Sequence, residues 1–185
     1  MAARDAFFEH GYGAAAIEQI ALAAGVSKVT IYNHFADKPG LFTAAIEREC
    51  ERVRGHFTID GEGSESLRDR LLQIGHAMVA FLSRPEMVQF ERRIAAETER
   101  NPEIGLAFLN AGPRQMKATL AAFLTGIAQT GALQIPDAGL AAEQFASMCK
   151  GFGDVERRFG APPSESATKQ RVEAAVDIFL KVYGR

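Results

Sequence analysis

Apolar residues recur three and four positions apart through most of this 185-residue chain. That spacing places them on one face of an α-helix, whereas a half-buried strand requires alternation of apolar and polar residues. No convincing alternating run bounded by turn residues occurs. The pattern therefore predicts an all-α fold of about nine helices. We expect helical segments at about 2–10, 17–24, 28–34, 38–57, 66–83, 85–100, 103–110, 113–130, 138–158 and 166–183, which are ten when the short one at 103–110 is included.

The composition agrees with a globular chain in a reducing compartment. Hydrophobic residues make up 47% of the chain and charged residues 24%, which is typical of a folded domain rather than a disordered one. The two cysteines, Cys50 and Cys149, are too few for a disulfide framework. No run of 18 apolar residues and no secretory signal occurs, so we expect a cytoplasmic protein with no membrane span.

A composition break divides the chain into two parts. Residues 58–66 are rich in Gly, Ser and acidic residues, and they predict a loop. We expect a three-helix module over residues 1–46 and a larger helical bundle over residues 47–185.

The stretch IEQIALAAGVSKVTIYNHFADKPGLF, residues 17–42, has the pattern of a helix-turn-helix. Gly25 can adopt the left-handed conformation that ends a helix, and Ser27 is suited to cap the next one. Ala21 is small enough for two helices to cross closely. We expect Val26, Ile31 and Phe35 to point into the module.

The outer face of the second helix of this motif carries groups that suit a DNA groove. Its cation, hydroxyl, amide and imidazole groups can bind phosphates and base edges, and valine methyls can contact thymine. Lys38 adds a cation at the start of the following helix. The net charge of −2 excludes a chain that is basic throughout, but it permits a local basic patch. On spacing alone, a compact helical hairpin with a polar face is the alternative.

These residues resemble the signature of TetR-type transcriptional regulators. GVSKVTIYNHFADKPGLF and the preceding FFEHGYGAAAIEQIALAAG carry the resemblance over residues 3–46. The C-terminal half resembles the AefR-like branch through RRIAAETERNPEIGLAFLNAGP and GLAAEQF. The resemblance implies phosphate contacts from Thr30, Tyr32, His34 and Lys38, base-facing positions at Lys28, Val29 and Asn33, and Ser27 within the same DNA-binding surface.

The chain departs from the family pattern in two ways. The family usually has Thr or Ser where this chain has Ala15 and Ala16, which removes a helix cap worth roughly 1 kcal/mol. The chain also begins later than usual, so basic residues that normally precede the first helix are missing. Either the sequence is trimmed or its non-specific affinity for DNA is low, because each lost phosphate contact weakens binding.

The resemblance implies a homodimer that binds a palindromic double-stranded operator, because one short helix is too little for specific recognition. The last two long helices carry apolar stripes that can pair across a two-fold axis. The alternative is that these stripes face their own core. The predicted interface comprises Phe145, Phe152, Val155, Phe159, Val172, Val176, Phe179 and Leu180.

The resemblance also implies that a small-molecule effector enters the bundle and releases the operator. Aromatic and methionine side chains form adaptable apolar sites, so we expect an apolar or aromatic effector. The alternative, plain core, is the more common role for each of these side chains. The candidates are His76, Met78, Phe81, Met87, Phe90, Arg93, Phe108, Met116, Phe123, Met148 and Phe152.

Motifs for catalysis and metal binding are missing from the sequence. It contains no GxSxG, no phosphate-binding loop and no dinucleotide fingerprint after a strand. The four histidines lack metal-ligand spacing, so we expect no metal, no cofactor and no enzymatic activity. The sequence predicts a ligand-responsive regulator of transcription, most often a repressor in this family. The alternative is a dimeric ligand-binding module that has lost DNA binding, which Ala15, Ala16 and the acidic run 47–51 favour. An all-α enzyme is a third reading with no residue constellation behind it.

Overall fold

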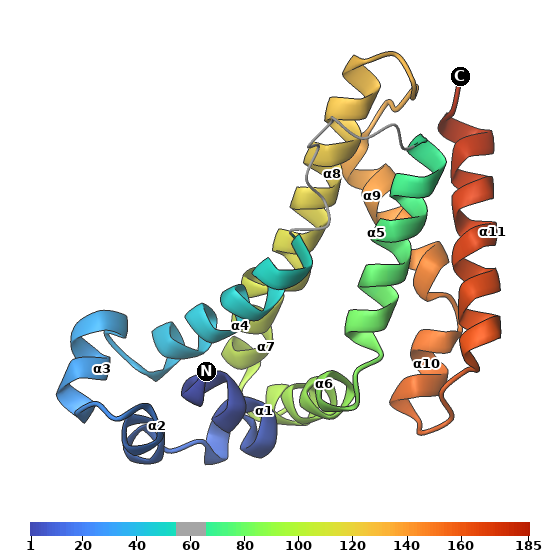
Figure 1. Cartoon of the computed structure of the whole chain (residues 1–185). Coiled ribbons are helices and arrows are strands. Elements are labelled where there is room, and N and C mark those ends of the chain that lie inside the picture. The colour runs from blue at the N-terminus through green and yellow to red at the C-terminus, as the bar shows by residue number, and fades with distance from the viewer. Residues whose placement is uncertain (55–65) are drawn as a thin grey trace. The chain divides into compact units, whose positions relative to one another are not determined.

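The computed structural model describes residues 1–54 and 66–185, which contain eleven helices and one isolated β-bridge, between Leu133 and Gly184 (Figure 1). The predicted all-α fold is confirmed. The helices are α1 (Ala2–Ala14), α2 (Ile17–Ala24), α3 (Lys28–Phe35), α4 (Lys38–Arg54), α5 (Leu67–Leu82), α6 (Pro85–Thr98), α7 (Pro102–Ala111), α8 (Pro113–Gln129), α9 (Ala138–Lys150), α10 (Gly153–Arg158) and α11 (Glu165–Tyr183).

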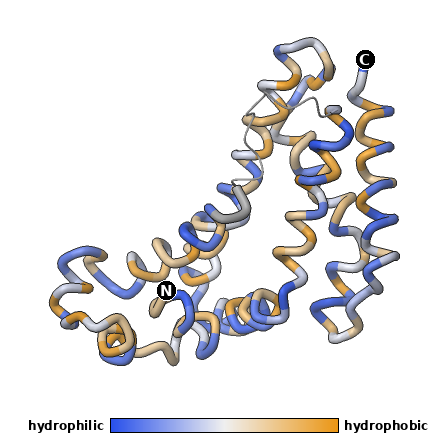
Figure 2. Tube along the Cα trace, viewed as in Figure 1, coloured by the Kyte–Doolittle hydropathy of each residue, from blue (hydrophilic) through white to orange (hydrophobic). Residues whose placement is uncertain are grey.

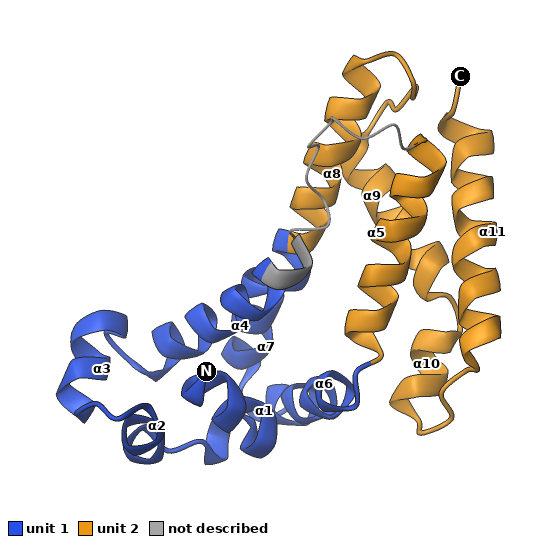
Figure 3. Ribbon diagram, in the orientation of Figure 1, with its two compact units in different colours: residues 1–52, 84–115 blue, residues 53–83, 116–185 orange. Residues whose placement is uncertain are grey.

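The chain forms two compact units (Figure 3). Unit 1 contains residues 1–52 and 84–115, and therefore α1 to α3, most of α4, α6 and α7. Unit 2 contains the described residues of 53–83 together with 116–185. Helices α6 and α7 thus pack in the same unit as the predicted N-terminal module. The functional boundary at residue 46 remains a prediction.

Aromatic rings form much of the core of unit 1. Phe7 meets Phe42 edge-on with ring centroids 5.2 Å apart, and Phe8 stacks on Phe90 at 4.2 Å. All four rings are buried. They join α1, α4 and α6, which are distant in sequence, and burial of each ring stabilises the unit by about 1.5–3 kcal/mol.

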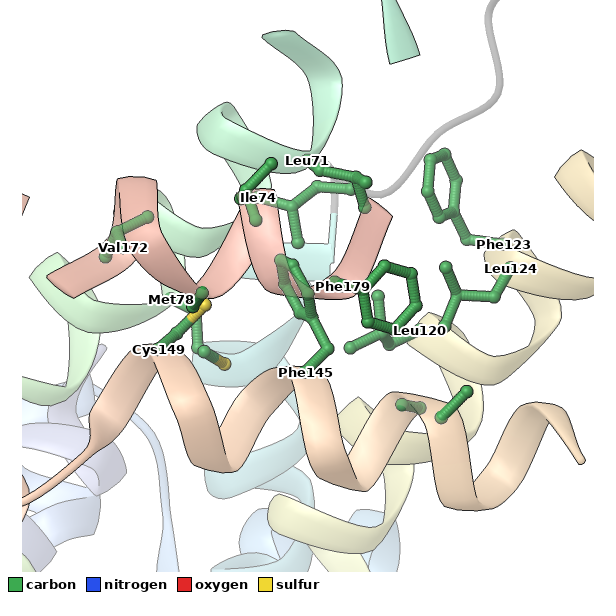
Figure 4. Close-up of a cluster of buried hydrophobic side chains, with 14 of the residues drawn as sticks. Leu71, Ile74, Met78, Leu120, Phe123, Leu124, Phe145, Cys149, Val172 and Phe179 are labelled. Atoms are coloured by element: carbon green, nitrogen blue, oxygen red, sulfur yellow. The ribbon is translucent and has the colours of Figure 1, made fainter. Parts of the chain in front are cut away.

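The core of unit 2 lies between α5, α8, α9 and α11 (Figure 4). Phe145 of α9 meets Phe179 of α11 edge-on at 5.3 Å. Figure 4 shows Met78 and Cys149 toward one end of this cluster and Phe123 toward the other. Hydrophobic and hydrophilic positions alternate along these helices at helical spacing (Figure 2), which explains why one face of each is buried.

Local sequence signals set many of the helix boundaries. Ser27, Ser66, Asn101, Asp137 and Ser164 each accept a backbone hydrogen bond as an N-cap. The helices α6, α7 and α8 begin with a proline, which has no N–H to leave unsatisfied in the first turn.

Two expected helices differ in the structure. The segment predicted at 138–158 is two helices, because Gly151 (φ 50°, ψ −155°) interrupts it. The backbone conformation favours glycine there, and a Cβ at Gly151 would lie 2.6 Å from the Arg171 Cδ, so the Arg171 side chain would have to move. The first helix was expected to stop at Gly11, which is non-helical (φ 80°), but helical structure resumes and continues to Ala14. The loop predicted at 58–66 lies outside the described residues except for Ser66.

Two predicted core residues are exposed. Val26 is 42% exposed and Phe35 is 37% exposed, so neither is buried within the helix-turn-helix as expected. Ile31 alone of the three is buried. An eight-residue helix that crosses its neighbour at one point has only a narrow inner face, and Ile31 fills it.

Candidate nucleic-acid interface

The turn between α2 and α3 has the geometry that its sequence predicts. Gly25 is left-handed (φ 67°, ψ 29°), and the N–H of Val26 donates to the Ala21 carbonyl at 3.0 Å. The Ser27 hydroxyl then accepts from the N–H of Thr30 at 3.0 Å and begins α3. A left-handed glycine and a serine cap therefore fix the direction in which α3 leaves the turn.

The exposed face of α3 presents the side chains that were predicted to meet DNA. Val29 is 66% exposed and Tyr32 is 38% exposed. Ser27, Lys28, Asn33 and His34 are also exposed, whereas Thr30 is half-buried. A short helix that is anchored by one buried residue and largely exposed elsewhere can enter a major groove.

Lys28 is paired within the chain. Its Nζ donates a short hydrogen bond to Glu18 of α2, and it lies 5.6 Å from the centroid of the Tyr32 ring. This hydrogen bond lowers the pKa of Glu18 and raises the pKa of Lys28. The sequence prediction did not include Glu18, because residues 18 and 28 meet only when α2 and α3 cross.

Lys38 is half-buried rather than free. Its Nζ donates to the Gly13 carbonyl at 3.1 Å and lies 4.8 Å from the centroid of the Tyr12 ring. Burial lowers the pKa of Lys38, and the negative charge of Glu97 opposes this effect. The ammonium group that was predicted to bind phosphate is therefore occupied by contacts to α1.

The first turn of α2 has no side-chain cap. Ala16 occupies the N-cap position in an extended conformation (φ −90°, ψ 131°), with no hydrogen bond from its side chain. Ala15 is 1% exposed. The missing hydroxyl at Ala16 thus leaves α2 uncapped, as the departure from the family pattern predicts.

The residues predicted to line an effector pocket belong to both units. Phe90 lies 5.7 Å from Phe108 and is fully buried in the aromatic core of unit 1. Arg93 donates a short hydrogen bond to the Phe8 carbonyl, so its guanidinium group holds α1. Four of the candidates lie in unit 1, namely Met87, Phe90, Arg93 and Phe108, and the remaining seven lie in unit 2. Within unit 2, Met78 and Phe123 belong to the buried cluster, Met116 and Met148 pack against it, His76 and Phe81 are half-buried, and Phe152 is 72% exposed.

Two cavities of about 720 and 570 Å³ lie within unit 1, and other residues line them. The first lies between α1 and α2 and includes His10 and Ala16. The second lies beside Tyr12, Glu97 and Arg100. The predicted pocket residues are absent from both linings, and a pocket formed by them remains a prediction.

The predicted dimer residues fall into two groups by exposure. Phe145, Val172, Val176 and Phe179 are 0% exposed, so they form the core of unit 2 and have no surface left for a partner. For these four the alternative reading, a stripe facing its own core, describes the structure. Leu180 is half-buried. The exposed members are Phe152 (72%), Val155 (43%) and Phe159 (84%).

Features of other functions are not seen in the described parts of the chain. No group of three His, Cys, Asp or Glu residues there is placed to bind a metal ion. His56 lies outside those residues. Over residues 1–54 and 66–185, no helix has the length and apolar character needed to cross a membrane.

Comparison with known proteins agrees with this geometry. Residues 1–45 match the tetR family of bacterial regulatory proteins, and residues 69–185 match the C-terminal domain of AefR-like transcriptional repressors. The chain is 30% identical over 112 residues to the HTH-type transcriptional regulator UidR of Escherichia coli K12. That alignment covers 59% of this chain and 54% of UidR, so the match spans about half of that relative.

Solved structures match over nearly the whole chain. A TetR-family transcriptional regulator from Mesorhizobium loti superposes with a TM-score of 0.81 and 29% identity, covering 100% of this chain and 94% of that one. The flavonoid-responsive regulator FrrA superposes with a TM-score of 0.73 and 34% identity, covering 99% and 93%. The helix-turn-helix of α2 and α3, the exposed face of α3 and these matches lead to one conclusion: the chain belongs to the TetR family of DNA-binding transcriptional regulators, a non-enzymatic family, and has an AefR-like C-terminal domain.

Proposed function

We propose that the protein is a repressor that binds a palindromic operator as a homodimer and releases it when a small apolar effector binds. The observation that carries the proposal is the capped helix α3, which exposes Val29, Tyr32 and Asn33 while Ile31 anchors it. The AefR-like repressor domain over residues 69–185 supports repression.

The proposed operator geometry follows from the shortness of α3. Eight residues reach only a few base pairs, so two copies about 34 Å apart are needed for specific recognition. Exposed apolar residues on α10 and at its ends, including Phe152 and Phe159, support pairing of two chains through unit 2.

The proposed effector class rests on one relative and on the composition of the chain. FrrA, 34% identical to this chain, is described as flavonoid-responsive. This chain has 13 phenylalanines and five methionines, which suit a planar apolar ligand. Such a ligand releases the operator only if it binds the DNA-free conformation more tightly than the DNA-bound one.

Selection of random duplex DNA by the purified protein at fixed near-physiological salt tests the proposal. We expect enrichment of a palindrome whose half-sites are about one helical turn apart. A folded dimeric protein that enriches no sequence would contradict operator binding and would favour a ligand-binding module without DNA function.

Variants of α3 test its assignment. On the enriched duplex, Lys28→Ala is expected to cost about 1–3 kcal/mol and to relax sequence preference if Lys28 reads a base. Lys169→Ala removes the same charge from the exposed surface of α11 and is the matched control. Equal affinities for both variants would show that Lys28 does not read a base.

A ligand panel tests the effector class. Flavonoids are titrated into the complex of protein and enriched duplex, and polar ligands of similar size serve as controls. A member of the proposed class raises the melting temperature of the free protein and lowers its affinity for the operator. Release by polar ligands alone would overturn the proposed effector class.

A further inference from the structure

Helix α1 is broken at Gly11, and two backbone groups near the break are bound by side chains of α6. Gly11 is left-handed in φ (80°), so regular helical hydrogen bonding cannot pass through it. The Phe8 carbonyl on one side accepts from the Arg93 guanidinium. On the other side the N–H of Gly13 donates to Glu97 Oε2 at 2.7 Å.

Arg93 and Glu97 are four residues apart and therefore project from the same face of α6. Arg93 supplies a donor to a backbone carbonyl, and Glu97 supplies an acceptor to a backbone N–H. A break in a helix leaves both kinds of backbone group without helical partners. A Cβ on Gly11 would lie 2.3 Å from Glu97 Oε1 and 3.7 Å from the Arg93 Cβ. The positive φ favours glycine at the break, and a Cβ there would displace the Glu97 carboxylate from its present position.

The same break is attached to α4. Lys38, the first residue of α4, donates from Nζ to the Gly13 carbonyl at 3.1 Å and covers the Tyr12 ring. Gly13 is therefore bound through its N–H to α6 and through its C=O to α4. Only Ala36 and Asp37 separate α4 from the end of the reading helix α3.

We infer that Arg93 and Glu97 are positioning residues for DNA recognition. Arg93 and Glu97 fix the break in α1. Lys38 attaches the start of α4 to that break, and because α3 ends only two residues earlier, this also fixes the end of α3. Their role is to hold α3 at the angle at which its side chains meet the bases. Lys38 acts as a tether within the protein and not as a phosphate contact. This inference rests on the proposed operator recognition and adds to it the residues that set the geometry.

Substitutions at Glu97 test the positioning role. Glu97→Ala is expected to weaken binding to the enriched duplex about tenfold, while binding to an unrelated duplex changes less than about twofold. Glu97→Gln keeps an oxygen that accepts from Gly13 and is expected to restore most of the affinity. Glu99→Ala removes an exposed carboxylate at the end of the same helix and is the matched control.

Hydrogen exchange of the Gly13 amide gives a readout that does not depend on DNA. Exchange is expected to be faster in Glu97→Ala and close to the original rate in Glu97→Gln. This measurement separates failure of the Glu97–Gly13 contact from failure of the proposed function. Unchanged Gly13 exchange in Glu97→Ala would show that Glu97 does not hold Gly13, even if no operator is found. Wild-type operator affinity in a Glu97→Ala variant with fast Gly13 exchange overturns the positioning role.

Lys38→Met distinguishes the tether from a phosphate contact. Methionine keeps an apolar stem over Tyr12 but loses the donor to Gly13. A tether predicts a lower ratio of specific to non-specific affinity with the salt dependence unchanged. A phosphate contact predicts equal weakening on every duplex and a salt slope smaller by about one. That second result overturns the inference about Lys38. The Lys38→Met measurement can be made even if the alanine variants fold poorly.

Discussion

The ammonium group of Lys28 has Glu18 as its partner within the chain, and in the proposed complex the phosphates or base-edge acceptors of a duplex compete for it. In the structure it binds Glu18, and both side chains are exposed. An exposed pair of this kind is easily exchanged, because water and salt screen it. If Lys28 contacts DNA as proposed, Glu18 lowers the affinity of α3 for DNA, since DNA must displace Glu18 before Lys28 can contribute.

Glu18→Gln is expected to strengthen binding to every duplex by a few fold and to steepen the salt dependence by about one phosphate contact. The reason is that Lys28 becomes free to bind the duplex. The measurement is affinity at several salt concentrations. Glu9→Gln removes an exposed carboxylate of α1 and is the matched control. Equal effects of the two variants would mean that net charge, not release of Lys28, is responsible.

Cys149 links the stability of unit 2 to alkaline pH. It is fully buried, and burial raises the pKa of its thiol to about 12 from 9.0. Between these values the unfolded chain loses the proton and the folded chain keeps it, so the free energy of unfolding falls as pH rises, by up to about 1.4 kcal/mol per pH unit.

Urea unfolding of the wild-type protein and Cys149→Ala at pH 8 and pH 10 measures this effect. The free energy of unfolding of the wild type is expected to fall by about 1.4 kcal/mol more than that of the variant, which has no thiol to ionise. A variant with the same pH dependence as the wild type would show that Cys149 does not titrate in this way.

At the scale of the element, the two helices of the DNA-binding motif differ in how they begin. Ser27 caps α3 with its hydroxyl, whereas Ala16 leaves α2 uncapped. Both helices have only eight residues, so one capping hydrogen bond contributes a large share of the stability of each helix. The extended conformation of Ala16 is already the one that a capping serine adopts.

Ala16→Ser is expected to stabilise the protein by about 0.5–1 kcal/mol, because its hydroxyl can accept from a free N–H in the first turn of α2. Thermal or urea unfolding measures the gain. Ala23→Ser lies inside the same helix, is exposed and cannot act as an N-cap, so it is expected to be neutral or slightly destabilising. A loss of stability in Ala16→Ser equal to that in Ala23→Ser would rule out the cap.

At the scale of the molecule, unit 2 has a buried core and a set of exposed apolar side chains on the helices that follow α8. Beside Phe152 and Phe159, Ile178 and Val182 of α11 are 52% and 65% exposed. Exposed apolar residues of this kind can mark association surfaces that a second chain covers. The proposed dimer therefore uses residues that the interior of unit 2 does not need.

Phe159→Asp is expected to convert the proposed dimer into a monomer, because the interface loses an aromatic anchor and gains a charge without a partner. Sedimentation or light scattering measures the mass, and operator affinity is expected to fall with it. Leu106→Asp, at an exposed apolar position on α7 of unit 1, is the control and is expected to leave the mass unchanged. A dimeric Phe159→Asp protein would place the interface elsewhere.

Short-range signals were sufficient for the fold class and for most of the exposed face of α3, but the inward positions predicted for Val26 and Phe35 were wrong. Helical spacing of apolar residues, Gly25 in the turn and Ser27 at the cap act within one or two helical turns, so the sequence alone determines them. The resemblance to TetR-type regulators, carried by residues 3–46, is confirmed by the tetR family match over residues 1–45. It was visible in the sequence because those residues form one local motif.

The tertiary structure decided which side of each helix has a neighbour and which charges are paired. An apolar stripe has the same sequence pattern whether it faces its own core or a second chain. Only the packing of unit 2 showed that Phe145 and Phe179 belong to the core. Likewise, Lys28 and Lys38 are cations in any reading of the sequence. Their partners, Glu18 and Gly13, reach them only across helix crossings, because such contacts depend on three-dimensional distance and not on separation along the chain.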